Sequence, residues 1–317
     1  MKCCRPMLLA AAVLAGMVSG AAAQTYPSRP VTMVVPFPPG GNTDLMARAL
    51  QTELSKALGQ SVIISNKGGA AGTIGILDLA RAEPDGYTMA LTPNNPITAQ
   101  PHMQQQLRYG MDTFRYICLT YYTPYVLIAG PQAPFKTFGE FVAFAKAKPE
   151  NVVYGHPGVA GQPHLVMLAV LKAIGADGLG VPFQGAGPMS HALLGGTIMA
   201  ITESPAVAKA SNLPILAALS DERIAGLPDV PTMKELGYPA VGFSAGGLIV
   251  PAKTPDGAVA VLEKACATAA AAPEYRTITE RLGAEPRYLP GAAFRAMFEQ
   301  DSVASADAIK RAGLGNR

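Results

Sequence analysis

The stretch VVPFPPGGNTD, residues 34–44, joins a short run of valines to a helical pattern through three prolines and two glycines. The run PVTMVVPF, residues 30–37, is apolar and rich in valine, which is typical of a buried parallel strand. After the loop, apolar residues recur at helical spacing from Ala47 to Leu58, and Gly59 ends the pattern. Residues 30–59 therefore predict a strand, a preshaped loop and a helix in direct succession.

This succession repeats along the chain, which predicts an α/β fold with parallel strands and right-handed crossovers. Further strands are expected at residues 61–65, 87–92, 152–155, 178–183, 197–202, 213–219 and 242–251. Helices are expected at residues 76–86, 138–148, 165–174, 190–194, 258–271, 274–282 and 292–312. The run FRYICLTYYTPYVLIAG, residues 114–130, is expected to form two consecutive strands interrupted at Pro124.

Two strand-like segments, near residues 121–125 and 241–248, lie where the chain could cross between lobes. We expect residues 24–123 and 242–317 to build lobe 1, and residues 124–241 to build lobe 2. Two lobes joined by two strands can hinge around a ligand.

The first residues are typical of a secretory signal. Lys2 and Arg5 precede an apolar run that ends in small residues, and Ala21-Ala22-Ala23 fits a cleavage site, so residues 1–23 are predicted to be removed. Cys3 and Cys4 precede the apolar run, where a lipid-anchor cysteine would follow it. The mature chain is therefore expected outside the cytoplasm, in the periplasm and free of a membrane anchor.

Composition excludes several classes of protein. Charged residues make up 15% of the chain and the formal net charge is +3, with no basic patch, so nucleic acid is not an expected partner.

Cys118 and Cys266 are the cysteines left after cleavage. An exported protein can form a disulfide, but two cysteines do not make a framework, so two separate buried thiols are the favoured expectation.

Glycine and proline gather in the loops that follow the predicted strands. In parallel α/β sheets, ligands bind beyond the carboxyl ends of the strands, where free N–H groups and the positive dipole ends of helices attract anions. Glycine lets a ligand approach the backbone, and proline fixes the loop before binding. The loops in question are residues 37–42, 68–72, 92–95, 155–164, 184–188 and 202–205. Each alone could be an ordinary turn, but six together indicate a ligand cleft.

Catalytic motifs are weak. Residues 242–246 match G-x-S-x-G, the pattern around a hydrolase nucleophile, but all four histidines precede Ser244, where that fold needs one after it. The glycine-rich loops contain neither a P-loop nor a dinucleotide fingerprint. His156 and His164 lack metal-ligand spacing. Asp44 and Arg48 stand four residues apart on the first helix and could be a surface pair or part of a site.

At this point a family resemblance becomes visible. YPSRPVTMVVPFPPGGNTDLMARAL, AGTIG, PDGYTMAL, VPFQGAGPMSHALLGG, LPDVPTMKELGYP and VPAKTP occur in order across nearly the whole mature chain. Together they resemble the periplasmic solute-binding proteins of tripartite tricarboxylate transporters, the Bug family. The resemblance implies a two-lobed periplasmic-binding-protein fold of the Venus-flytrap type II class. It also implies capture of a small organic carboxylate as a monomer, delivery to membrane permease subunits, no cofactor and no enzymatic activity.

Carried over to this chain, the resemblance also implies the residues that grip the ligand. One wall would be Phe37, Pro38, Gly40, Gly41 and Asn42, with Thr92, Asn94 and Asn95 in the same lobe. The facing wall would be His156, Gly158, Val159, Ala160, Gly161 and Gln184, with Glu203 at the rim.

The facing loop departs from the family pattern. In this loop, His156 and Ala160-Gly161 stand where the family usually has small hydroxyl residues. Elsewhere in the chain, Met199 stands at a position that is acidic in the family, and Ala245 stands where the family commonly has a tryptophan. The His156 ring could donate a hydrogen bond, or it could simply face solvent. An aromatic wall could come from Phe37, Tyr121 or Tyr122. We therefore hypothesise a larger or flatter ligand, such as an aromatic carboxylate.

Two other functions stay open from the sequence. A secreted α/β hydrolase would use Ser244 as its nucleophile. A sensor subunit would share the binding fold but would hand its bound state to a signalling partner.

Overall fold

The structure is a computed structural model that describes residues 26–104, 106–147, 152–183 and 186–315. The predicted signal segment, residues 1–23, lies outside the described residues. No helix in the described ranges has both the length and the apolar character needed to cross a membrane.

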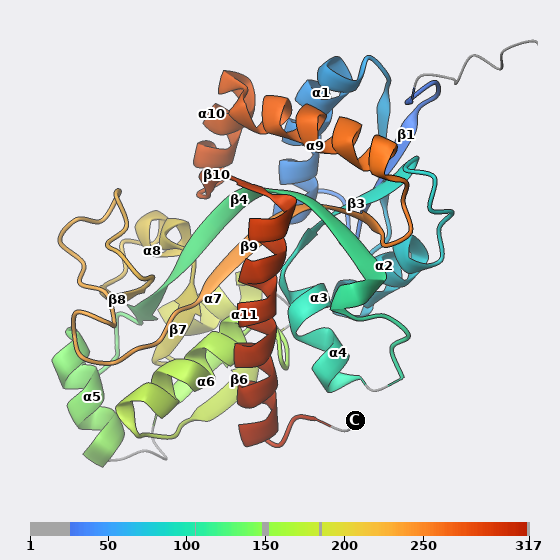
Figure 1. Cartoon of the computed structure of the whole chain (residues 1–317). Coiled ribbons are helices and arrows are strands. Elements are labelled where there is room, and N and C mark those ends of the chain that lie inside the picture. The colour runs from blue at the N-terminus through green and yellow to red at the C-terminus, as the bar shows by residue number, and fades with distance from the viewer. Residues whose placement is uncertain (1–25, 105, 148–151, 184–185, 316–317) are drawn as a thin grey trace, which may run out of the picture.

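The described strands form one ten-stranded mixed sheet (Figure 1). Its order is β2-β1-β3-β9-β4-β7-β5-β6, and β8 and β10 also pair with β4. The strands are β1 Val31–Val35, β2 Val62–Asn66, β3 Thr88–Pro93, β4 Phe114–Ala129, β5 Val153–His156, β6 Leu179–Pro182, β7 Ala200–Glu203, β8 Ile215–Leu219, β9 Phe243–Pro251 and β10 Glu285–Pro290.

The helices lie around this sheet as two groups linked by one long helix. They are α1 Asn42–Leu58, α2 Thr73–Ala80, α3 Asn95–Thr98, α4 Gln100–Met103, α5 Phe138–Ala147, α6 Gln162–Ile174, α7 Ala186–Leu194, α8 Pro205–Ala210, α9 Asp256–Ala271, α10 Pro273–Arg281 and α11 Gly291–Arg311. Two short 3-10 helices, Ala70–Gly72 and Met111–Thr113, complete the set.

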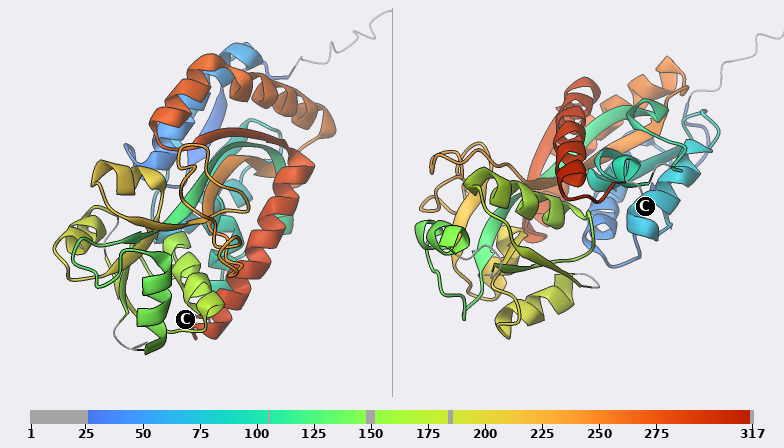
Figure 2. Two further views of the ribbon diagram at one scale, coloured as in Figure 1. Left: turned by 90° about the vertical axis from the view of Figure 1, so that its left-hand side faces the viewer. Right: turned by 90° about the horizontal axis from the view of Figure 1, so that it is seen from below.

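The structure confirms the predicted fold class, a two-lobed α/β protein with two crossing strands. One half holds β1, β2 and β3 in parallel, and the other holds β5, β6 and β7 in parallel. In the right-hand view of Figure 2 the blue and cyan start of the chain lies in one half and the green and yellow middle in the other, with α11 between them. β4 and β9 run antiparallel through the centre and join the halves.

β4 is one strand of 16 residues, where the sequence predicted two strands broken at Pro124. Proline lacks an N–H and normally disrupts a sheet ladder. Pro124 sits where β4 changes partners: residues up to Pro124 pair with β9, while Tyr125 pairs with β8. The N–H that Pro124 lacks would fall where β4 changes partner, so its absence does not end the strand.

Separate hydrophobic clusters stabilise the two halves. In the first half, β1, α1 and α9 pack around buried residues such as Met33, Leu50 and Leu262. In the second half, α5 and α6 pack around Phe141, Tyr154 and others. Complete burial of one such side chain contributes about 1.5–3 kcal/mol to the free energy of unfolding. Each half therefore has its own core, which suits two bodies that hinge.

Cys118 on β4 and Cys266 on α9 form a disulfide, contrary to the expectation of separate thiols. Both cysteines are fully buried, and α9 packs across the sheet so that their Cα atoms lie 6.5 Å apart. This distance is within the range that disulfides span. The residues are 148 positions apart, so spacing alone could not reveal the pairing.

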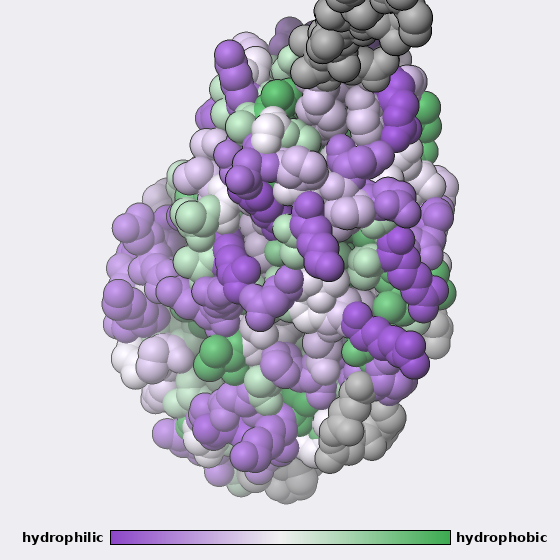
Figure 3. Space-filling model, turned by 45° about the vertical axis from the view of Figure 1, so that its right-hand side comes forward, coloured by the Kyte–Doolittle hydropathy of each residue, from purple (hydrophilic) through white to green (hydrophobic). Residues whose placement is uncertain are grey.

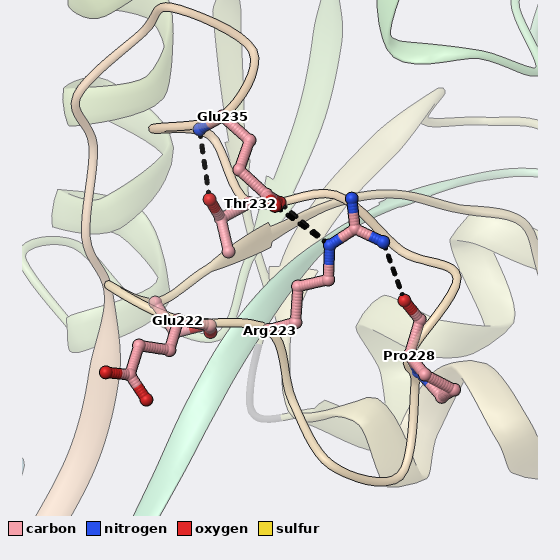
Figure 4. A network of polar contacts seen from close by, with 6 residues as sticks. Glu222, Arg223, Pro228, Thr232 and Glu235 are labelled. Atoms are coloured by element: carbon pink, nitrogen blue, oxygen red, sulfur yellow. Dashed lines mark hydrogen bonds and ion pairs between the residues drawn. The ribbon is translucent and has the colours of Figure 1, made fainter.

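The long segment after β8, residues 220–242, is held by a polar network (Figure 4). Arg223 Nε donates to both Glu235 carboxylate oxygens at 3.0 Å, and its guanidinium also donates to the Pro228 carbonyl at 2.8 Å. Thr232 and Glu235 exchange hydrogen bonds through backbone and side chain. The segment thus keeps a fixed path on its way to β9.

The coloured part of the surface in Figure 3 is mostly hydrophilic or intermediate, and hydrophobic side chains show in small separate patches.

Candidate functional site

A cavity of about 850 Å³ lies where the two halves of the sheet meet. Loops from both halves contribute to it. Of the residues proposed from the sequence, the cavity is lined by Phe37, Pro38, Gly40, Gly41, Asn42, Asn94, Asn95, Gly158, Val159, Gly161 and Glu203.

The N-terminus of α1 opens onto this cavity. Its N-cap residue is Gly41, and no side chain caps the helix. The first intrahelical bond runs from the Leu45 N–H to the Gly41 carbonyl at 3.0 Å, so the N–H groups before it have no acceptor within the helix. Gly40 has a φ of 81°, a left-handed conformation that glycine adopts without strain. The loop therefore presents bare backbone donors and a positive dipole end.

Asp44 fixes the shape of this loop. Its Oδ2 accepts hydrogen bonds from the Gly40 N–H at 2.9 Å and from Arg48 Nε at 2.8 Å, and Oδ1 accepts one from Asn66 at 2.9 Å. Burial alone would raise the pKa of the Asp44 carboxyl, but these partners outweigh it and the pKa lies below its usual value. The pair with Arg48 is thus a loop anchor with a buried carboxylate.

The N-terminus of α6 opens onto the cavity from the other half. Gly161 is its N-cap without a side-chain cap, and Pro163 stands in the first turn, where a missing N–H removes no helix bond. Gly158 has a φ of 152° and lines the cavity together with Val159. The two helices therefore offer two anion-attracting ends to one cavity.

His156 and His164 form a stacked pair behind this loop. Their rings are 3.8 Å apart at 5°, and both side chains are buried. Burial, reinforced by His156, lowers the pKa of His164 to about 4, and burial also lowers the pKa of His156. His164 Nδ1 accepts a hydrogen bond from the Ala160 N–H at 3.0 Å. The neutral pair therefore supports the loop from inside.

Four residues proposed from the sequence are not among those that line the cavity. His156 lies in the stacked pair, where it is buried from solvent and is not among the residues that line the cavity. Thr92 is fully buried and donates to the Pro93 carbonyl at 3.0 Å. Ala160 is buried, and its carbonyl accepts a hydrogen bond from Asn95 at 3.0 Å. Gln184 lies outside the described residues.

The cavity also has polar residues outside the set of ligand contacts proposed from the sequence, namely Thr43, Thr123, Tyr125, Gln162, Ser204 and Ser244. Gln162 and Ser204 fall within the loops at residues 155–164 and 202–205 that the sequence did indicate. Thr123 and Tyr125 come from the middle of β4, and Ser244 comes from β9. No loop signal marks these positions, because they face the cavity only after the crossing strands have paired. Thr43 and Gln162 are early residues of α1 and α6, and the N-terminal position of each helix could have indicated them.

The aromatic wall differs from the sequence expectation. Phe37 and Tyr125 line the cavity. Tyr121 lies in the core of the first half, and Tyr122 packs against Phe243, so neither belongs to the described lining. Burial raises the pKa of the Tyr125 phenol well above its usual value, so the group is neutral near pH 7.

Two buried polar atoms on the described lining lack a hydrogen-bond partner, Thr123 Oγ1 and Gln162 Oε1. Buried polar groups are normally paired, and leaving one unpaired costs about 1–3 kcal/mol. Both atoms are fully buried, so neither is open to the cavity in this conformation.

A second cavity, of about 710 Å³, lies between the C-terminal halves of α6 and α11. Helix C-termini carry the negative end of the dipole, and the two cations on the lining, Lys172 and Arg311, already pair with Asp307. The cavity at the two helix N-termini is therefore the better candidate site.

The sequence profile of the tripartite tricarboxylate transporter family receptor matches residues 46–314. The chain is 35% identical over 254 residues to protein BugT of Bordetella pertussis, covering 78% of each chain. It is also similar to a solved TctC solute-binding protein from Polaromonas, with 35% identity, a TM-score of 0.81, and coverage of 90% of this chain and all of that one. A Rhodopseudomonas palustris protein solved with malate is 30% identical, with a TM-score of 0.75, covering 90% of this chain and all of that one.

The chain belongs to the tripartite tricarboxylate transporter receptor family, whose members are periplasmic solute-binding proteins. Membership in this family implies that the protein is located in the periplasm and that it is a receptor and not an enzyme. The hydrolase hypothesis for Ser244 is therefore wrong. Ser244 lies within β9, paired with Thr123, and not on the sharp strand-to-helix turn that a nucleophile elbow requires.

Proposed function

We propose that this protein captures a small organic carboxylate in the cavity between its lobes and delivers it to the membrane subunits of a tripartite tricarboxylate-type permease. The single observation that carries the proposal is the joint opening of α1 and α6, by their uncapped N-termini, onto one cavity. A carboxylate placed there would accept backbone hydrogen bonds from both lobes and would favour their closure.

Each set of loop residues would contact a different part of the ligand. Gly40, Gly41 and Asn42 would hold one side of the carboxylate, and Gly158 and Gly161 the other. Asn94 and Asn95 would complete the polar wall, and the Phe37 and Tyr125 rings would contact the ligand body. The protein solved with malate, and another R. palustris protein solved with adipate, support a carboxylate as the ligand class.

The rings of Phe37 and Tyr125 keep an aromatic carboxylate among the candidates. A thermal-shift screen of aliphatic and aromatic carboxylates would test this, followed by calorimetry of the best ligand. A rise in melting temperature with an aromatic carboxylate is the expected result. Stabilisation by citrate or succinate alone would contradict an aromatic ligand, and the absence of any carboxylate ligand would contradict the proposed function itself.

We further propose that residues 24–123 and 242–317 form lobe 1, that residues 124–241 form lobe 2, and that the protein acts as a monomer. Export would remove residues 1–23. Intact-mass measurement of the periplasmic protein should give a chain that begins at Gln24, and light scattering should give the mass of one chain. A retained N-terminus or a stable dimer would contradict these points.

A further inference from the structure

We propose that the ligand carries a hydrogen-bond donor, most simply an ammonium group, at the end opposite its carboxylate, and that Glu203 receives this group. The inference rests on the proposed function and narrows its substrate class from carboxylates in general to amino acids with separated charges.

The first support is the charge of the cavity. Among the described residues that line it, Glu203 is the sole carboxylic acid, and there is no lysine, arginine or histidine. The remaining polar residues of the lining are neutral amides and hydroxyls. A ligand with two carboxylates would therefore set one of them in a cavity whose only charged side chain is negative.

The second support is the state of Glu203. It ends β7 and is half-buried, and its Oε1 accepts a hydrogen bond from the Ser204 N–H at 2.8 Å. No ion pair among the described residues involves this carboxylate, and burial raises its pKa. A carboxylate removed from water without a cation is unfavourable. A ligand ammonium would supply the missing charge.

The two helix N-termini and Glu203 make opposite demands. The backbone donors of α1 and α6 favour a negative group, whereas the Glu203 carboxylate favours a donor. One molecule that carries a carboxylate at one end and an ammonium at the other satisfies both. This pattern differs from the dicarboxylates malate and adipate, with which two related proteins were solved.

Calorimetry with ligand pairs of matched length tests the inference. The probes are 4-aminobutanoate against succinate and 6-aminohexanoate against adipate, each titrated into the wild-type protein near neutral pH. At least one amino acid is expected to bind ten-fold or more tightly than its matched diacid. Equal or tighter binding of both diacids would overturn the inference but would leave the carboxylate-binding function intact. If none of the four binds, the inference is also overturned, and the wider carboxylate screen then decides the proposed function.

The variant Glu203→Gln keeps the shape of the side chain and removes its charge. It is expected to weaken binding of the amino acid ten-fold or more and to strengthen binding of the matched diacid. Glu222→Gln is the control, because Glu222 is exposed in the segment after β8 and lies outside the cavity lining (Figure 4). Melting temperatures of both variants report folding. Unchanged binding of the amino acid by a folded Glu203→Gln protein would overturn the inference.

Discussion

Gly41 illustrates how a single residue can serve binding without serving the fold. Its φ of −75° suits any amino acid, and a Cβ there would meet only the Pro38 carbonyl oxygen at 3.5 Å, an ordinary contact. A side chain would nevertheless enter the cavity that Gly41 lines, beside the free N–H groups of α1. Gly41 is therefore a residue where binding and stability can be separated.

We expect Gly41→Val to weaken carboxylate binding by at least 100-fold, because the side chain occupies the approach to the helix N-terminus. The stability cost should stay near 1 kcal/mol, since valine is a poor N-cap residue. Calorimetry and thermal unfolding measure the two effects. Gly139→Val is the control: Gly139 also has open space around its Cβ position but lies in α5, outside the cavity lining. Unchanged affinity in Gly41→Val would show that the loop is only a turn.

At the residue scale, the sequence could predict the backbone part of the candidate site more completely than its side chains. Glycines and prolines between strand and helix indicated Gly40, Gly41 and Gly161, because their backbone requirements are local. His156 was assigned to the ligand wall, but in the structure its ring stacks on the His164 ring and is drawn inward. Burial of that kind depends on packing, which no local pattern encodes.

At the scale of an element, the loop before α6 depends on the neutral form of His164. The His164 Nδ1 atom accepts the Ala160 N–H, and a proton on that nitrogen would break the bond. The folded-state pKa of about 4 lies below the ordinary value of 6.5. Between these values the unfolded chain binds a proton that the folded protein does not, so stability is complete above pH 6.5 and is lost as the pH falls toward 4.

We therefore expect the free energy of unfolding to fall by about 2 kcal/mol between pH 7 and pH 5 because of this residue. Denaturant titrations at both values measure the difference. In His164→Asn the difference should shrink, whatever the absolute stability of the variant. His191→Asn is the control, because His191 is exposed on α7. An equal loss of stability in wild type and His164→Asn would contradict the role given to this pair.

The sequence predicted most elements but missed those without a hydrophobic pattern. β10 has only exposed and half-exposed residues and contains two prolines, so nothing in its sequence suggests a strand. It exists because the edge of β4 offers it an antiparallel partner. The opposite error occurred at Pro124, where pairing with successive neighbours carries β4 through a residue that usually ends a strand.

At the scale of the whole molecule, α11 ties the two halves together. Its Asp301 carboxylate is buried and accepts hydrogen bonds from Asn94 at 2.8 Å and Thr98 at 2.6 Å in one half, and from Gln162 at 3.1 Å in the other. A small apolar cluster that includes Ala99, Leu165 and Ile309 continues this contact. A single helix thus contacts both lobes. The sequence predicted the bounds of this helix but not where it packs.

We expect Asp301→Ala to lower the free energy of unfolding by about 2–4 kcal/mol, because three donors lose a buried acceptor. It should also weaken ligand binding, since Asn94 and Gln162 line the cavity. Denaturant unfolding and calorimetry measure the two losses. Asp307→Asn, on the same helix but in an exposed pair with Lys172 and Arg311, should change neither appreciably. Equal stability of the two variants would show that Asp301 does not join the lobes.

The most direct test of carboxylate capture is a crystal structure with the carboxylate that most raises the melting temperature. The ligand is expected in the cavity between the lobes, with carboxylate oxygens about 2.7–3.2 Å from N–H groups that open α1 and α6. A ligand bound instead in the cavity between α6 and α11, or a carboxylate that makes no contact with either helix N-terminus, would contradict the proposed mode of binding.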